Sequence, residues 1–304
     1  MSVLRSEATD AYDRTCQILL MRLDKFGSYR PQLEKIGTDR IKLNLSGAKE
    51  PDRIRYILQQ RGELQFWLGA KNKDAFNYLD DVNKFIAAHP QFMPVDTSLT
   101  NNVTTDELNE QNASAENNPL FAKLYPNINP ETGELIEGCV VGFASTKDRA
   151  AIDEMLAKAR QKNILPPTIK FLWGAKPSRT NDRYELYAIQ VTTRDGSPLL
   201  DGGVISDARQ YFNNTTGNEI TITMNSEGAR EWKRITGANV GEFIAIVLDD
   251  VVFSAPRICG EIEGGRSSIT GDFTEEEAKD IANLFKSGKL PLPVKIVKET
   301  IFEQ

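Results

Sequence analysis

The segment from residue 96 to residue 118 constrains the fold of this chain more than any other feature of its sequence. It reads DTSLTNNVTTDELNEQNASAENN, in which nearly every side chain is small or polar. Such a segment has little apolar surface to bury, so it cannot offset the entropy that it loses on ordering. The sequence therefore predicts a mobile linker at about 96–118, with folded structure on both sides of it.

Before this linker, the spacing of apolar residues predicts helices that alternate with short strands. Apolar side chains recur at three- and four-residue steps over 5–26, which indicates a helix that ends at Gly27. Alternation over 41–45 indicates a half-buried strand, and Pro51 suits the first turn of the next helix. The apolar run at 63–69 then predicts a second strand.

After the linker, the same reasoning predicts a longer alternation of strands and helices. Thr274 and Glu277 have the spacing of a capping box, and the pair Asp249-Asp250 suits the turn of a hairpin. Residues 206–213 are predicted as a helix and residues 290–304 as an extended segment. Further strands are predicted at 139–143, 168–173, 184–191, 219–224, 243–248 and 251–256. Helices mixed with hairpins indicate an α+β fold rather than a doubly wound sheet.

The charge balance argues against a general nucleic-acid-binding protein. The chain has 43 acidic and 37 basic residues among 304, which gives a formal net charge of −6. A nucleic-acid binder needs a basic face. The mean hydropathy is −0.40, and no apolar run approaches the roughly 18 residues that span a bilayer. The sequence as given is therefore expected to be soluble.

Few residues suit catalysis or metal binding. The one histidine, His89, precedes a proline. A single histidine cannot form a paired-histidine metal motif, and it gives little support to a Ser-His or Cys-His catalytic arrangement. Cys16, Cys139 and Cys259 lie far apart and form no CxxC, which favours buried free thiols, although one disulfide remains possible. These observations favour a protein that is not an enzyme and has no cofactor or metal.

Two glycine clusters leave one alternative open. Residues 201–203 and 263–266 carry neither the GxGxxG pattern nor the P-loop pattern, so turns are the simpler interpretation. The alternative is a small-molecule-binding module or a hydrolase built on these loops. It would require titratable groups that converge in a pocket.

Several blocks of the sequence resemble a known family. The block from Asn225 to Pro256, continued from Ile262 to Val294, is similar to the large extracytoplasmic domain of SecD, an accessory membrane subunit of bacterial protein export. The segment LMRLDKFG at 20–27 and the segment at 45–67 resemble the N-terminal part of the same domain. These blocks follow the order of the family and cover more than half of the chain.

The resemblance implies a domain of two lobes. A ferredoxin-like base lobe would comprise 1–95 and 289–304, and a head lobe would comprise 186–288. An additional α/β insertion would occupy 96–185. The family's transmembrane helices have no counterpart in these residues. The resemblance therefore implies a soluble fragment of a membrane-anchored protein, exposed on the extracytoplasmic (periplasmic) side.

The resemblance also implies a function and partners. In the family, the head lobe is thought to hold an emerging unfolded preprotein while proton-driven movement of head against base assists export. The implied partners are the unfolded preprotein and, through the missing membrane part, SecF and the SecYEG channel, with no nucleic acid. Candidate preprotein contacts are Phe243, Val252, Phe253 and Ile258, and candidate hinge residues are Pro90, Pro94, Gly288, Leu290 and Pro291.

Simpler interpretations stand beside these assignments. The four contact candidates could be ordinary sheet core, because one face of an alternating strand must be buried. Gly288 could be only a helix C-cap. For the whole domain, the alternative is a structural scaffold that holds other Sec subunits without touching cargo.

Overall fold

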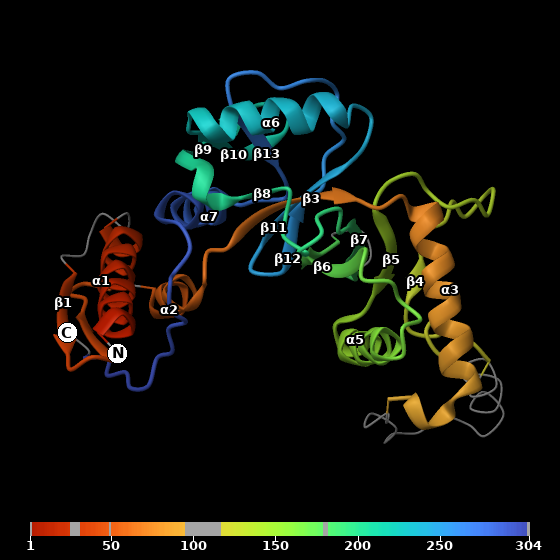
Figure 1. The fold of residues 1–304 in the computed structure, drawn as a ribbon, viewed down its shortest axis with the longest axis horizontal. Helices are drawn as coiled ribbons and strands as arrows, with labels where there is room; N and C mark the ends of the chain where they lie inside the picture. The colour runs from red at the N-terminus through yellow and green to blue at the C-terminus, as the bar shows by residue number, and fades with distance from the viewer. Residues whose placement is uncertain (1, 25–30, 49, 95–116, 179–181, 303–304) are drawn as a thin grey trace.

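The computed structural model of the chain describes residues 2–24, 31–48, 50–94, 117–178 and 182–302. Its helices and strands form an α+β fold (Figure 1), as the sequence predicts. The predicted linker at 96–118 lies almost wholly outside the described residues, and so does Gly27. None of the described helices is both long and apolar enough to cross a membrane.

Most of the predicted elements are present. The α-helices are α1 (Ser2–Asp24), α2 (Pro51–Gln59), α3 (Asn72–Ala88), α5 (Thr146–Gln161), α6 (Ser226–Ala238) and α7 (Glu275–Ser287). The strands are β1 (Gln32–Ile36), β2 (Arg40–Asn44), β3 (Leu64–Gly69), β4 (Tyr125–Pro126), β5 (Val140–Ala144), β6 (Ile169–Pro177), β7 (Tyr184–Gln190), β8 (Leu200–Asp201), β9 (Ile205–Asn213), β10 (Gly217–Met224), β11 (Ile244–Leu248), β12 (Val251–Ser254) and β13 (Arg266–Thr270). Two 3-10 turns lie at Pro90–Phe92 and Gly202–Val204.

Five strands close into a ring by their pairing, and they lie at the centre of the molecule (Figure 1). The strands β7, β6, β12, β11 and β3 are hydrogen-bonded in that order, and β3 pairs back with β7. The closing contact is short: Leu68 pairs with Gln190, and the Ala70 N–H donates to the Ala188 carbonyl at 2.9 Å. Every pairing in the ring is antiparallel except that of β6 with β12. Closure satisfies the edges of strands that would otherwise be exposed.

The interior of the ring is an apolar core of its own. Its buried members are Trp67, Ile189, Val191, Ala245, Val247 and Val252, and Leu172, Tyr187 and Ala255 pack against them. The Trp67 indole N–H donates to Gln65 Oε1 at 3.0 Å, so its one polar group has a partner. The Lys170 ammonium lies 4.5 Å from the centre of the same ring system, within cation–π range.

Neighbouring residues of β3 belong to different cores, because successive side chains of a strand point to opposite faces. Trp67 points into the ring, whereas Phe66 is fully buried in a second core outside it. There Phe66 meets Trp232 of α6 edge to face, with ring centroids 5.0 Å apart. This second core lies between the ring and the sheet β9–β10–β13, and α6 and α7 complete it. We call β9, β10, β13, α6 and α7 the α6–α7 lobe.

Two further lobes attach to this body (Figure 1). In the α3–α5 lobe, these two helices and residues 120–124 pack on the outer faces of β5, β6 and β7. In the N-terminal lobe, α1 and α2 pack with β2 and with Leu290 and Val294 of the C-terminal segment. Among the residues that the structure describes, the strands β1 and β2 of the N-terminal lobe pair only with each other.

The predicted helix at 206–213 is wrong, because these residues form strand β9. They pair with β10 in antiparallel register from Ile205 to Asn213, with one irregularity. Pairing with the edge of β10 outweighs the weak local preference for a helix, and the adjacent aromatic residues Tyr211 and Phe212 favour a strand. Both aromatic side chains are exposed.

The ferredoxin-like base implied by the resemblance would be completed by a C-terminal strand at 291–302, but among the described residues 291–302 pair with no strand. The predicted extent of the base lobe also differs from the packing. Residues 1–95 were assigned to one lobe, but β3 belongs to the ring and α3 packs on α5 and β5. The reason is that the apolar side chains of β3 and α3 find their partners beyond residue 120. Strands of all three predicted units therefore share one sheet.

The buried position of Trp67 makes a stability prediction. We expect Trp67→Ala to lower the free energy of unfolding by about 3–5 kcal/mol, because it empties the centre of the ring. Phe212→Ala is the matched control, since its side chain is 60% exposed, and we expect it to change stability by less than about 0.5 kcal/mol. Urea unfolding followed by far-UV circular dichroism measures both. Equal effects of the two substitutions would contradict the assignment of Trp67 to the ring core.

Candidate functional site

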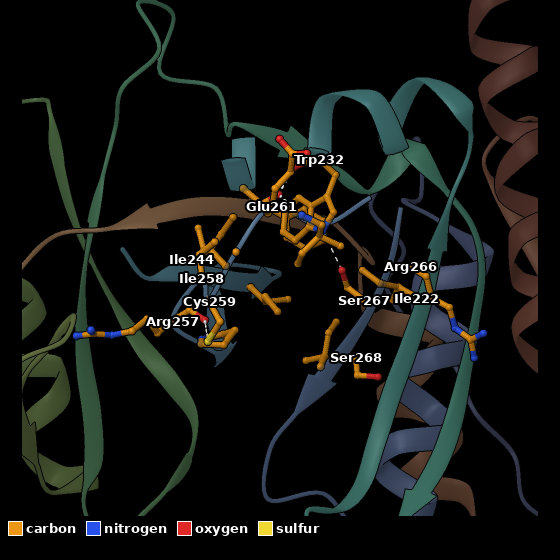
Figure 2. A pocket seen from close by; sticks show the side chains of 17 residues that line it. Ile222, Trp232, Ile244, Arg257, Ile258, Cys259, Glu261, Arg266, Ser267 and Ser268 are labelled. Atoms are coloured by element: carbon orange, nitrogen blue, oxygen red, sulfur yellow. Dashed lines mark hydrogen bonds between the residues drawn. The ribbon is translucent and has the colours of Figure 1, made fainter. Parts of the chain in front are cut away.

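A groove of about 570 Å³ opens between the α6–α7 lobe and the outer face of the ring (Figure 2). One wall is β13 and the neighbouring strand β10, and the other is the segment 256–262 that follows β12. The base is apolar and comes from four elements of the shared core: Phe66 of β3, Ile244 of β11, Ile222 of β10 and Trp232 of α6. The groove is therefore an opening into the apolar core between the ring and the α6–α7 lobe.

Specific polar bonds hold the walls in place. The Trp232 indole N–H donates to Ser267 Oγ of β13 at 2.9 Å, which fixes the indole in the groove (Figure 2). The Thr236 hydroxyl donates to the Trp232 carbonyl at 2.8 Å and accepts from the Ile262 N–H at 2.9 Å. Thr236 is fully buried, and the bond from the Ile262 N–H ties the segment 256–262 to α6.

The rim of the groove carries charges of both signs. Arg257 pairs with Glu137, and its guanidinium lies 5.1 Å from the centre of the Phe243 ring. Glu261 accepts from Lys233 at 3.2 Å. Because these charges neutralise one another, the rim does not select a ligand of one sign. The apolar residues of the base are nearly fully buried, so a ligand would first contact the half-buried apolar wall residues Pro256 and Ile262.

One wall of the groove offers a strand edge. Within the described residues, β13 pairs with β10 on one side and with no strand on the other. An edge strand presents unpaired N–H and C=O groups that an extended polypeptide can join. The groove thus combines apolar surface with backbone groups, and neither feature depends on the sequence of the ligand.

The four predicted contact residues lie at different depths around this groove. Ile258 is buried and lines it. Phe243 is half-buried under Arg257, and Phe253 packs partly buried against the core of the α6–α7 lobe. Val252 is 2% exposed and points into the ring. Contact of these residues with a ligand stays a prediction, and it would require the ring to open at Val252.

Sequence reasoning missed Trp232, Thr236 and Ser267 as groove residues. In the sequence, the spacing of Trp232 indicates only an apolar position of a helix, and nothing marks Ser267 as its partner. The signal available was local: a buried tryptophan needs a partner for its N–H. No spacing in the sequence indicated that this partner lies 35 residues away, across the groove.

The predicted hinge residues fall in two places. Gly288, Leu290 and Pro291 follow α7, where the chain passes back to the N-terminal lobe. The Leu290 N–H donates to the Arg61 carbonyl at 2.7 Å, beside the passage from α2 to β3. Pro90 instead begins a 3-10 turn after α3 and Pro94 follows that turn, and Phe92 and Met93 between them pack on the α3–α5 lobe. Among the described residues, no passage to the N-terminal lobe runs through these prolines.

The glycine clusters form turns, in agreement with the simpler interpretation. Asp201 accepts from the Gly203 N–H at 2.7 Å at the start of a 3-10 turn. Gly264 and Gly265 have φ values of 76° and 64°, and a Cβ on Gly265 would lie 2.6 Å from the Ala229 Cβ. Among the described residues, no three His, Cys, Asp or Glu side chains gather as a metal site.

The three thiols differ in burial, and none is paired. Cys16 and Cys139 are buried, whereas Cys259 is exposed on the wall of the groove. Burial raises the pKa of the Cys139 thiol to about 12 and also raises the pKa of Cys16. Burial keeps reagents away from these two thiols. Their raised pKa values also keep them in the thiol form, whereas the thiolate is the reactive form.

Comparison with known proteins places this geometry in a family. Residues 180–292 match the family model of the SecDF P1 head subdomain, and residues 12–71 match that of the N-terminal part of the SecDF P1 domain. The chain is 36% identical over 303 residues to a protein translocase subunit SecD of Rhodothermus marinus. The chain belongs to the SecD/SecDF family. The described lobes are therefore a P1 domain.

Other comparisons agree with this assignment. A stretch of 103 residues is 40% identical to a protein translocase subunit SecDF of Thermus thermophilus. A solved structure of a SecDF membrane component that enhances protein export has the same fold, with a TM-score of 0.52 and 23% identity over 97% of this chain and 94% of that one. The chain spans 47% of the Rhodothermus marinus protein, or about half of its length. Both family models describe subdomains of a translocase subunit, and neither describes an enzyme.

The thiol environments predict selective labelling. We expect a maleimide at pH 7 to modify Cys259 rapidly and to leave Cys16 and Cys139 unmodified in the folded chain. The pKa of about 12 at Cys139 leaves almost no thiolate at that pH. Peptide mass spectrometry after labelling identifies the modified residue, and the chain unfolded in guanidinium, where all three react, is the control. Labelling of Cys139 before unfolding would contradict the buried position.

Proposed function

We propose that this chain is a non-catalytic domain of a protein-export subunit and that its groove holds an unfolded polypeptide in transit. The single observation that carries this proposal is the apolar groove bordered by the open edge of β13. An unfolded preprotein has no fixed sequence or shape, so its binder must use features common to all chains. Apolar side chains and backbone hydrogen bonds are such features.

The relatives support a role in export. Those compared above are named protein translocase subunits, and one structural relative is described as enhancing protein export. We infer by this likeness that the chain works on the extracytoplasmic, periplasmic side of a membrane-anchored subunit. Its further partners would be SecF and the SecYEG channel, reached through the membrane part of that subunit.

We further propose that export involves movement of a head lobe against a base lobe. In this proposal the α6–α7 lobe is the head, and the N-terminal lobe is a base with a ferredoxin-like arrangement. Packing of α1 and α2 with the strand β2 supports the second assignment. The part of the α3–α5 lobe that follows residue 117 would be the predicted insertion, whereas its helix α3 comes from the residues predicted for the base. The ring shares strands with all three units, so movement is expected at the passages to the N-terminal lobe.

Blocking the groove tests the binding step in the isolated chain. We expect a pyrene maleimide on Cys259 to raise the dissociation constant of a fluorescent, permanently unfolded polypeptide at least tenfold, which corresponds to about 1.4 kcal/mol. The matched control carries Lys73→Cys and Cys259→Ser, so that the same label sits on α3, where Lys73 is exposed. Fluorescence anisotropy measures both. Equal affinities of the two labelled chains would refute the groove as the binding site.

Photocrosslinking tests the proposal in the whole subunit. A photoreactive phenylalanine at Ser268, exposed on the groove wall, should form adducts with a preprotein stalled during export. The probe at Phe253 tests the predicted contact, and the probe at Lys73 is the control. We expect adducts from position 268 and none from position 73. Export that depends on the domain without any adduct would instead favour the scaffold function.

A further inference from the structure

Arg22 occupies an unusual position at the end of α1. Its side chain is fully buried, with 0% exposure, although a charged group is rarely buried without a carboxylate in direct contact. It lies where the chain passes between the N-terminal lobe and the rest of the molecule. One passage runs from α2 to β3, and the other leaves α7 at Gly288.

Each of the five N–H donors of Arg22 has an acceptor. On the first passage, Nη1 donates to the Ile57 carbonyl at 3.0 Å and to the Gln60 carbonyl at 2.5 Å, and Nη2 donates to the Arg61 carbonyl at 3.1 Å. On the second passage, Nη2 donates to the Gly288 carbonyl at 3.1 Å and Nε donates to Ser287 Oγ at 3.2 Å. One planar guanidinium therefore bonds to both passages at once, in the fork geometry that lysine cannot reproduce.

Helix ends explain how the charge is tolerated. The acceptors lie at the C-termini of α2 and α7, where unpaired carbonyls carry a partial negative charge. Arg22 is itself in the last turn of α1, and its own carbonyl accepts from Asn283 Nδ2 at 2.7 Å. Three helix C-termini thus converge on one cation. Burial lowers the pKa of Arg22 to about 10, against the opposing effect of Asp249, so the side chain stays charged at neutral pH.

The surrounding backbone is shaped to this side chain. Gly62 has a φ of 74°, and a Cβ there would lie 2.5 Å from Arg22 Nη2 and 2.9 Å from the Gly288 oxygen. The Gly62 and Glu63 N–H groups donate to the Asp249 carboxylate at 3.0 and 2.8 Å, which fixes the first passage to the β11–β12 turn. The passages are therefore anchored to the ring on one side and to Arg22 on the other.

We propose that Arg22 is the positioning residue of the joint between the N-terminal lobe and the body of the molecule. By bonding to both passages it makes them move as one unit and sets the angle between the lobes. The inference rests on the proposed movement of the head lobe against the base lobe. It assigns the pivot of that movement to Arg22 with Gly62 and Gly288.

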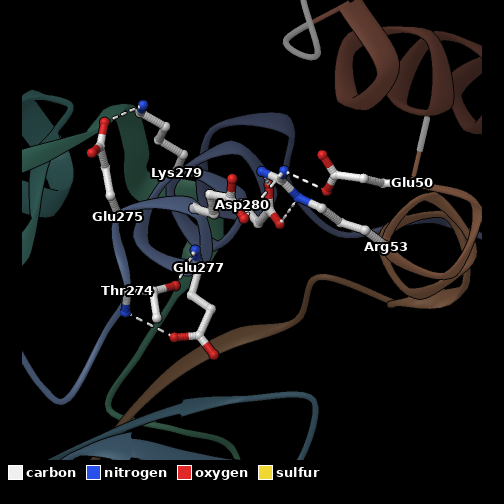
Figure 3. Close-up of polar contacts among 8 residues, drawn as sticks. Glu50, Arg53, Thr274, Glu275, Glu277, Lys279 and Asp280 are labelled. Carbon is white, nitrogen blue, oxygen red and sulfur yellow. Dashed lines mark hydrogen bonds and ion pairs between the residues drawn. The ribbon is translucent and has the colours of Figure 1, made fainter. Parts of the chain in front are cut away.

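A second interlobe pair provides the comparison. Arg53 of α2 forms two bonds to Asp280 of α7, Nε to Oδ2 at 2.6 Å and Nη2 to Oδ1 at 2.8 Å, and one to Glu50 at 2.9 Å (Figure 3). Its side chain is 22% exposed, and it contacts neither passage in these bonds. This bidentate pair is strong, but it links α2 to α7 through two side chains and not through the carbonyls of the passages. Arg53→Met is therefore the matched control for loss of one interlobe arginine.

The distribution of distances between the lobes tests the proposal. Spin labels at Asp10→Cys on α1 and Glu227→Cys on α6, in a Cys259→Ser chain, report it by pulsed electron resonance. We expect one narrow peak for the parent chain, at least twofold broadening for Arg22→Lys and Arg22→Met, and a nearly unchanged width for Arg53→Met. Near-UV circular dichroism confirms that the ring and the α6–α7 lobe remain folded in each variant.

Three outcomes would overturn the proposal. The first is a broad distribution of interlobe distances in the parent chain. This outcome does not depend on whether any variant folds. The second is a folded Arg22→Lys chain with the parent width, which would make Arg22 a filler of the interface only. The third is equal broadening by Arg53→Met. No polypeptide ligand is present in this experiment, so failure here leaves the groove untouched, and failure of the groove tests leaves the joint untouched.

Discussion

The pairing of β3 with β7 is the contact on which the rest of the structure depends. It joins residues more than 100 positions apart and turns an open sheet into a ring. Closure gives β3 two buried faces, so that Trp67 fills the ring and Phe66 fills the core outside it. The α6–α7 lobe and the α3–α5 lobe then pack on outer faces of strands whose inner faces are already fixed.

The groove and the joint both follow from this arrangement. Strand β11 places Ile244 at the base of the groove, and the hairpin turn after it carries Asp249, which holds Gly62 and Glu63. The site for a polypeptide and the passage to the N-terminal lobe are thus connected through one hairpin of the ring. The hairpin is the structural link by which a ligand in the groove would affect the joint. The polar bonds of Arg22 hold the N-terminal lobe in one orientation.

Local patterns predicted much of the fold. The capping box of Thr274 and Glu277 forms as expected, and Asp249 and Asp250 adopt positive φ values of 51° and 63° in a hairpin turn. What local patterns could not predict is long-range pairing. Residues 206–213 became a strand because β10 offered an edge, and α3 left the predicted base lobe because its apolar face matched α5. The resemblance gave Gly288, Leu290 and Pro291 as hinge candidates; they follow α7, and a hinge there stays a prediction. The role of Arg22 was hidden, because its acceptors are backbone carbonyls.

Residue-resolved hydrogen exchange at the closing contact measures whether the ring stays closed in solution. The Ala70 amide donates across this contact to the Ala188 carbonyl, whereas the Ala188 amide donates to the Cys139 carbonyl, beside β5 and outside the ring. In a closed ring, the Ala70 amide exchanges as slowly as those of β11, only when the whole body unfolds. Fast exchange of Ala70, at the rate of an exposed loop while β11 and Ala188 stay protected, would show that the ring is open in solution and would contradict the closure on which the fold depends.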